Sequence, residues 1–148
     1  MKRLFYLLAA AAFTACGSAT TLSVMTFNMR YDNPEDGADN WRFRRGRVAE
    51  VIASHGVDVF GTQELLANQL GDLKRLLPGY AAVGVGREDG AEAGEFSAVF
   101  YRRDRFTPLE SGTFWLSETP DVAGSKGWDG ACERVATWVV LHDREGGR

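Results

Sequence analysis

Two apolar segments of this chain end in polar side chains that could hold a cation and a phosphate. The first, residues 22–28 (LSVMTFN), ends at Asn28, and the second, residues 57–64 (VDVFGTQE), ends at Gln63 and Glu64. Parallel strands of an open α/β sheet bring their carboxyl ends to one edge, where such sheets bind ligands. We therefore expect Asn28 and Glu64 to lie close together. One carboxylate and one carboxamide, with no nucleophile beside them, suit a hard cation such as Mg²⁺ and an anionic substrate.

The elements that would position these residues follow from periodicity and capping signals. Residues 41–54 are predicted as a helix that Asn40 caps and Gly56 ends, and residues 66–77 as a second helix with a leucine stripe. Strands are expected at residues 22–27, 57–61, 80–85, 96–101, 113–116 and 134–141, with loops at 31–40, 86–94 and 117–132. Two βα units followed by successive strands predict an α/β (α+β) chain with a mixed sheet and helices on one face.

Two further side chains are expected in the interior. His55 falls on the apolar face of the first helix with Val48 and Ile52, and Trp138 lies inside an apolar strand. His55 and His142 are the only histidines, and neither belongs to a Ser/His/Asp arrangement or a zinc-like spacing.

Six short motifs resemble, in order and spacing, the N-terminal half of the endonuclease/exonuclease/phosphatase superfamily. They are TFNMR (26–30), DVFGTQE (58–64), GEFSAVFY (94–101), GTFWLSETP (112–120), GWD (127–129) and RVATW (134–138). Two of them, GTFWLSETP and GWD, look most like an exported bacterial branch that is distantly similar to deadenylases. The resemblance implies a four-layer α/β/β/α sandwich with mixed sheets, of which residues 20–148 would be a partial domain.

The resemblance also implies roles for the residues at the strand ends. Glu64 would bind the catalytic Mg²⁺, or Mn²⁺ in its place, and Asn28 would help to organise the metal and the scissile phosphate. Gln63 would orient this neighbourhood by hydrogen bonds. Without the resemblance, Glu64 could be an acid at a helix start and Asn28 a turn residue.

Three more residues are candidates for catalysis or substrate contact. Glu95 matches a glutamate that orients the catalytic histidine in deoxyribonuclease-like members, and Arg134 matches an arginine that contacts phosphate. Trp128 stands in a loop and is the best of the tryptophans for substrate contact. The alternatives are a solvated acid for Glu95, a surface ion pair for Arg134 and a structural role for Trp128.

The first residues form a targeting segment. Lys2 and Arg3 precede ten apolar residues, 4–13, about half of the ~20 that span a membrane, so residues 1–19 are predicted to be a signal peptide. Cleavage after Ala19 and lipidation of Cys16 remain alternatives. We expect an exported protein, in the cell envelope on a lipid anchor or free in the periplasm or medium, monomeric and without a disulfide. Residues 20–148 carry a net charge of about −5, which argues against tight sequence-blind DNA binding.

Two functions remain open. One is a metal-dependent phosphoester hydrolase, of the nuclease or phosphatase class, acting on a nucleic acid, phosphoinositide, sphingolipid or small phosphodiester. The superfamily's Thr-His-x-Asp, Gly-Asp-x-Asn and Ser-Asp-His motifs are not in the sequence, so the 148 residues are expected to be a fragment, inactive alone and poorly folded. The other is a non-catalytic remnant or binding module of the same fold.

Overall fold

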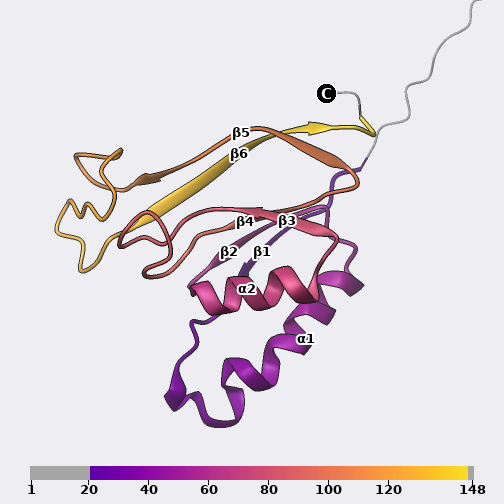
Figure 1. Ribbon diagram of the computed structural model, residues 1–148, viewed down its shortest axis with the longest axis horizontal. Helices are drawn as coiled ribbons and strands as arrows, with labels where there is room; N and C mark the ends of the chain where they lie inside the picture. The colour runs from indigo at the N-terminus through magenta and orange to yellow at the C-terminus, as the bar shows by residue number, and fades with distance from the viewer. Residues whose placement is uncertain (1–20, 147–148) are drawn as a thin grey trace, which may run out of the picture.

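The computed structural model describes residues 21–146, and the predicted signal segment lies outside them. Figure 1 shows two layers of strands with helices below them. The elements are β1 (Val24–Asn28), the 3₁₀ helix η1 (Pro34–Asp39), α1 (Trp41–Ser54), β2 (Val59–Gln63), α2 (Ala67–Leu76), β3 (Tyr80–Val83), β4 (Val99–Arg102), β5 (Phe106–Trp115) and β6 (Val135–Asp143). No helix within residues 21–146 is both long and apolar enough to cross a membrane.

The first sheet is mixed, as predicted, with strand order β1-β2-β4-β3. β1 and β2 run parallel, and their register pairs Asn28 with Gln63 at the carboxyl ends. β4 runs antiparallel to both β2 and β3. The side-by-side parallel pair is the feature that brings the two polar strand ends together.

The two faces of this sheet bury different clusters. Toward α1 and α2 lies the larger core, in which the rings of Phe60 and Phe100 stack with centroids 4.5 Å apart. Toward β5 and β6 lies a smaller cluster built on Ala81, Tyr101 and Phe106. Successive residues of a strand face opposite sides of its sheet, which is why Phe100 and Tyr101 enter different clusters.

The helix α1 has the predicted bounds. The Asn40 side chain accepts a hydrogen bond from the Arg42 backbone N–H at 3.2 Å, as expected of an N-cap. Gly56 follows the helix with φ +56°, a left-handed conformation that glycine adopts at little cost. Residues 31–40, predicted as a loop, contain η1.

The strands β5 and β6 form a separate antiparallel pair that faces the first sheet (Figure 1). β5 begins at Phe106, seven residues before the predicted start. The first half of the strand was not predicted because residues 107–112 include polar residues and a glycine and show no continuous apolar pattern. A register shift between Pro108 and Glu110 lets the strand pass the proline.

Two expectations about buried side chains are wrong. His55 is exposed at the end of α1, where its Nδ1 lies 2.8 Å from the Val51 carbonyl oxygen. Trp138 is 42% exposed, on the face of the β5–β6 pair that points away from the first sheet. An apolar strand does not reveal which of its two faces will be covered.

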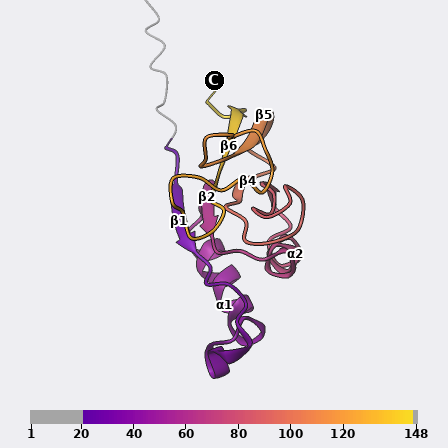
Figure 2. The same ribbon diagram turned by 90° about the vertical axis from the view of Figure 1, so that its left-hand side faces the viewer.

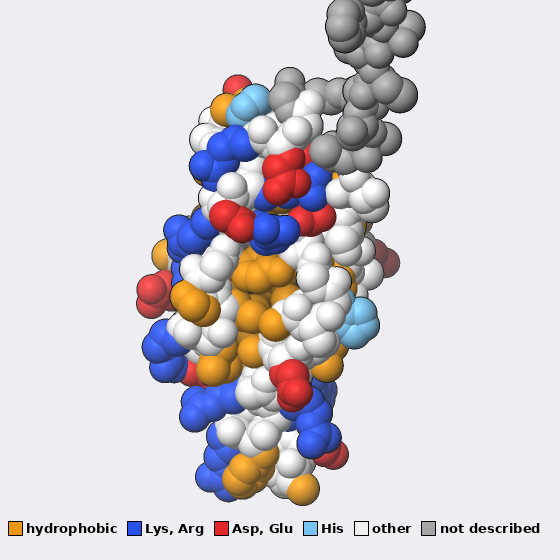
Figure 3. Space-filling view, turned by 90° about the vertical axis from the view of Figure 1, so that its right-hand side faces the viewer, with side chains coloured by type: hydrophobic (Ala, Val, Ile, Leu, Met, Phe, Trp, Pro, Cys, Tyr) orange, Lys and Arg blue, Asp and Glu red, His pale blue; other side chains and the backbone are white. Residues whose placement is uncertain are grey.

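The two sheets are joined at one end by ionised side chains. Arg105, only 4% exposed, donates to Asp58 at 2.8 Å and to Asp143 at 2.7 Å, so it links the residue just before β2 to the end of β6. Figure 3 looks at this end and shows acidic and basic side chains interleaved above a hydrophobic strip. This cluster lies at the amino ends of β1 and β2, opposite the predicted site.

Candidate active site

The structure brings Asn28 and Glu64 into contact, as the sequence predicts. The Asn28 Nδ2 donates to Glu64 Oε1 at 2.9 Å, and Asn28 Oδ1 accepts from the Arg30 backbone N–H at 2.8 Å. With its oxygen and nitrogen both engaged, Asn28 holds one carboxylate oxygen of Glu64 in place. The other oxygen of Glu64 has no partner among the described residues.

Glu64 occupies an unusual backbone conformation directly after β2. Its φ of +57° lies in the left-handed region, which residues with a Cβ enter at a cost of about 1 kcal/mol. The next residue, Leu65, is fully buried and pairs with Phe96. The turn therefore directs the Glu64 side chain to the strand ends while the chain continues into the core.

One cavity of about 210 Å³ collects most of the predicted site. Five of the six candidate residues line it: Asn28, Gln63, Glu64, Glu95 and Arg134. The remaining lining residues are Arg87, Ser97 and Val135. Gln63 is anchored by a 3.1 Å hydrogen bond from its Nε2 to Thr26 Oγ1. Residues from four separated segments thus converge on a single small volume.

Sequence reasoning did not single out Arg87. Its Nη1 donates to Glu95 Oε2 at 2.7 Å, and the two backbones also pair, with Arg87 N–H donating to the Glu95 carbonyl at 3.1 Å. The Arg87 Nε is buried and has no partner within residues 21–146. Glu95, predicted to orient a histidine, therefore contacts an arginine here. The feature of the sequence that could have indicated a role for Arg87 is its place as a basic residue near the start of the glycine-containing loop 86–94.

The residues present fit a divalent cation of the magnesium kind. No group of three or more His, Cys, Asp or Glu side chains that could hold a metal occurs in the described chain. Mg²⁺ is commonly held by one or two carboxylates, with waters and substrate phosphate as its other ligands. The open oxygen of Glu64 offers one such carboxylate, and the arginines beside it suit phosphate oxygens.

A second hydrogen-bonded group steadies the turn after β1. The Arg30 guanidinium donates to Asp36 at 3.2 and 3.0 Å and lies over the Tyr31 ring. The hydrogen bond from Arg30 holds the pKa of Asp36 below its ordinary value of 3.8. Because the Arg30 backbone also holds Asn28, this turn is tied to η1.

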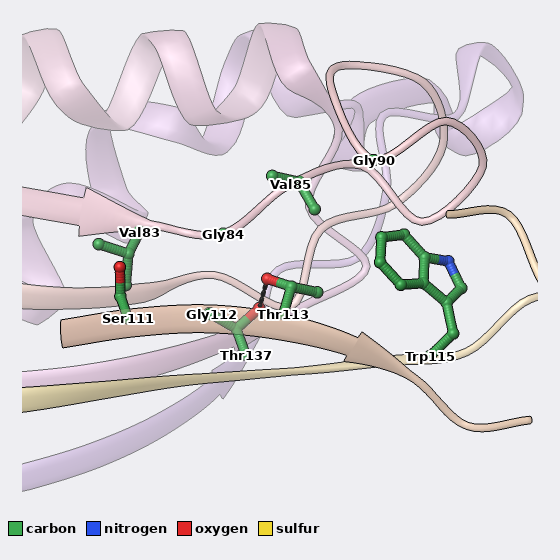
Figure 4. Close-up of a pocket in the computed structure, with 9 residues that line it drawn as sticks. All are labelled: Val83, Gly84, Val85, Gly90, Ser111, Gly112, Thr113, Trp115 and Thr137. Atoms are coloured by element: carbon green, nitrogen blue, oxygen red, sulfur yellow. Dashed lines mark hydrogen bonds between the residues drawn. The ribbon is translucent and has the colours of Figure 1, made fainter. Parts of the chain in front are cut away.

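Trp115 positions the loop that carries Arg87. This tryptophan is 6% exposed, and its Nε1 donates to the Arg87 carbonyl at 2.6 Å. It borders a cavity of about 360 Å³ between β3 and the β5–β6 pair, where the Thr113 and Thr137 hydroxyls lie 3.0 Å apart (Figure 4). No ionisable side chain lines that cavity, so it offers no acid or base chemistry.

Trp128 does not line the Asn28–Glu64 cavity. It stands 62% exposed in the loop between β5 and β6, beside a separate cavity that it shares with Glu118 and Asp129. Figure 2 faces the end of the molecule at which this loop lies. The Leu116 N–H donates to the Arg134 carbonyl at 2.8 Å, which closes the base of the loop next to Arg134.

Comparisons with known proteins agree with this arrangement. The Endonuclease/Exonuclease/phosphatase family matches residues 25–146. A comparison with curated proteins found no match. An endonuclease/exonuclease/phosphatase from Bacteroides vulgatus is 50% identical, with 83% of this chain and 47% of that chain covered and a TM-score of 0.82.

Two other solved structures show how far the similarity extends. A mannosyl-6-phosphatase from Bacteroides thetaiotaomicron is 46% identical, covering 86% of this chain and 48% of that one, with a TM-score of 0.83. The human Nocturnin catalytic domain shares the fold at 20% identity, with 86% of this chain and 46% of that chain covered and a TM-score of 0.64. The chain thus spans about half the length of the structures it matches. It belongs to the endonuclease/exonuclease/phosphatase family.

Proposed function

We propose that this chain supplies the cation- and phosphate-binding part of a metal-dependent phosphoester hydrolase. The observation that carries the proposal is the cavity at the ends of β1 and β2, where two carboxylates, two carboxamides and two arginines meet. Family membership gives this arrangement its context. The groups that activate water would come from sequence beyond residues 1–148.

Glu64 would hold the cation, Mg²⁺ or Mn²⁺, with Asn28 fixing the orientation of its carboxylate. Bound there, the cation would stabilise negative charge on the phosphoryl group. Arg134 and Arg87 present N–H donors to phosphate oxygens from two other segments. Glu95 keeps Arg87 at the cavity, and Gln63 keeps the end of β2 packed against β1.

Among phosphoesters, a sugar phosphate has the best support. A relative that is 46% identical is named a mannosyl-6-phosphatase. The chain without residues 1–19 would carry about −5 charges, which disfavours a long polyanion such as nucleic acid. Phosphoinositides and small phosphodiesters share the phosphate chemistry and serve as competing substrates in the tests.

A non-catalytic phosphate-binding module is the second candidate. The observation that favours it is that neither His55 nor His142 lines the cavity, so the described residues offer no imidazole to take a proton from water. Hydrolysis by a longer product would exclude this candidate. Binding of phosphate without turnover by the native product would favour it.

We also propose that the protein is exported as a monomer without a disulfide, by a signal in residues 1–19. The intact mass of the native product would reveal both its length and how its N-terminus is processed. Cleavage after Ala19 and diacylation at Cys16 give different masses, and Cys16→Ser abolishes only the second. A mass that includes residues 1–19 unmodified would refute the export proposal.

The decisive test of the site is Glu64→Gln in the native product. Mn²⁺ binding, followed by electron paramagnetic resonance, is expected to be lost, and Mg²⁺-dependent release of phosphate to fall by at least about a hundredfold. Glu50→Gln, at an exposed position of α1, is the matched control and should change neither. Unchanged Mn²⁺ binding in Glu64→Gln would overturn the assignment of Glu64.

A further inference from the structure

The loop between β5 and β6 is a built structure rather than a loose connection. Ser117 is buried and its Oγ lies 2.7 Å from Ser125 Oγ, which in turn donates to the Thr119 carbonyl at 3.0 Å. The Gly130 N–H donates to the Gly127 carbonyl at 3.0 Å. These contacts fix the loop on which Trp128 stands.

Within this loop, two consecutive residues hold a conformation that side chains rarely adopt. Trp128 has φ +49° and Asp129 has φ +57°. Just before them, Gly127 packs so tightly that an added Cβ would lie 2.1 Å from Glu118 Oε2, and the Trp128 N–H lies 3.4 Å from Glu118 Oε1. Such conformations persist where the surroundings enforce them, and they cluster at binding sites. Here they keep an indole 62% exposed to solvent.

Two connections tie this loop to the Asn28–Glu64 cavity. Leu116 pairs with Arg134, which lines the cavity, and Glu118 follows two residues later, within about 7 Å of chain. The loop also packs against the segment that carries Arg87. A Cβ on Gly124 would lie 2.4 Å from the Glu88 carbonyl oxygen, and one on Gly90 would lie 2.9 Å from the Ala123 Cβ. The loop that carries the exposed indole is therefore joined to both segments that supply arginines to the cavity, one with Arg87 and one with Arg134.

The chemistry around Trp128 indicates which molecule would lie on it. Its cavity, of about 290 Å³, also presents the carboxylates of Glu118 and Asp129 and the ammonium of Lys126. Residues 116–133 carry four acidic side chains and one basic one, a balance that repels a polyphosphate backbone. An aromatic face beside carboxylates suits a neutral ring with apolar C–H groups and hydroxyl donors.

We propose that the Trp128 loop is the sugar subsite of the enzyme. The ring of a sugar phosphate lies on the Trp128 indole, its hydroxyls donate to Asp129, and its phosphate occupies the Asn28–Glu64 cavity. Glu118 acts as the brace that holds Gly127 and Trp128 in place. This inference rests on the proposed function. It assigns a binding site to the sugar ring, the part of the substrate that the Asn28–Glu64 cavity would not contact.

The test is calorimetric titration of the native product with mannose 6-phosphate, inorganic phosphate and adenosine monophosphate, with Ca²⁺ in place of Mg²⁺ so that binding is measured without hydrolysis. Mannose 6-phosphate is expected to bind most tightly. Trp128→Ala should weaken its binding about tenfold and leave inorganic phosphate unchanged, while Trp128→Phe retains most of the affinity because the ring remains. Trp138→Ala, at the other exposed tryptophan, is the matched control and should change no affinity.

Each remaining outcome separates the two proposals. If mannose 6-phosphate binds no more tightly than inorganic phosphate, or if Trp128→Ala leaves its affinity intact, the sugar subsite is refuted and the phosphate site stands. Tightest binding of adenosine monophosphate, lost in Trp128→Ala, would make the loop a base-stacking platform instead. If inorganic phosphate binds equally to Glu64→Gln, the proposed function itself fails.

Discussion

The ion pair between Arg87 and Glu95 is the contact in the candidate site that the sequence did not predict. Their ion pair is largely shielded, with side-chain exposures of 16% and 23%, and it leaves the buried Arg87 Nε as a donor without a partner in the described chain. An unpaired buried donor is unfavourable until a ligand accepts from it. The proposed phosphate site would offer the Arg87 guanidinium a further partner.

Replacing Arg87 by Ala is predicted to weaken inorganic phosphate binding about tenfold, because at least one charge-assisted hydrogen bond is lost. Equilibrium dialysis with radiolabelled phosphate measures the effect in the native product. Arg47→Ala, at an exposed position of α1, removes the same charge away from the cavity and should change little. Equal affinities of Arg87→Ala and the unmodified protein would remove Arg87 from the site.

The elements themselves were largely predictable. The cap at Asn40, the glycine at 56 and the apolar periodicity between them are local signals, and they placed α1 correctly. The apolar runs before Asn28 and Glu64, read as parallel strands, predicted the contact of these two residues. Arg87 was missed because its role depends on a loop folding back to Glu95, and no local pattern encodes that pairing.

The helices α1 and α2 are connected by hydrogen bonds to one buried carboxylate, that of Asp72. Asp72 of α2 accepts from the Trp41 Nε1 at 2.8 Å and from Arg45 at 3.1 Å, and it also contacts Arg75. Burial of the Asp72 carboxyl raises its pKa, but these hydrogen bonds outweigh the burial and leave the pKa below its ordinary value. Trp41 itself is 2% exposed.

Trp41→Phe is therefore predicted to lower the free energy of unfolding by about 1–3 kcal/mol, since it leaves the Asp72 carboxylate short of a donor and removes part of a packed ring. Urea denaturation followed by circular dichroism gives the value. Trp138→Phe, at a half-exposed position, should lower it less. A larger loss in Trp138→Phe would contradict the packing described for α1 and α2.

For the molecule as a whole, Arg105 adds an ionic link between the two sheets at one end, beside the apolar cluster that packs between them. The hydrogen bond from Arg105 lowers the pKa of Asp143 from 3.8 to about 2. A carboxyl group with a depressed pKa in the folded state stabilises the fold above its unfolded pKa. That stabilisation is lost as the pH falls from about 4 toward 2.

Asp143→Asn is accordingly predicted to be less stable than the unmodified protein at pH 7 and to show a flatter decline of the unfolding midpoint between pH 4 and pH 2. Thermal melts across that interval check both. Asp121→Asn, at an exposed loop position, is the control. Parallel declines for Asp143→Asn and the unmodified protein would show that the Arg105 cluster does not couple acid to stability.

Because Glu64 has a left-handed backbone conformation, selection for stability and selection for activity should favour different residues at position 64. Glycine or asparagine would relax this turn, so variants chosen only for heat resistance should drift toward those residues at position 64. Variants chosen for turnover should retain the glutamate. The frequency of each residue in two parallel mutant libraries would then record how much folding stability the protein gives up to keep the carboxylate that we propose as its cation ligand.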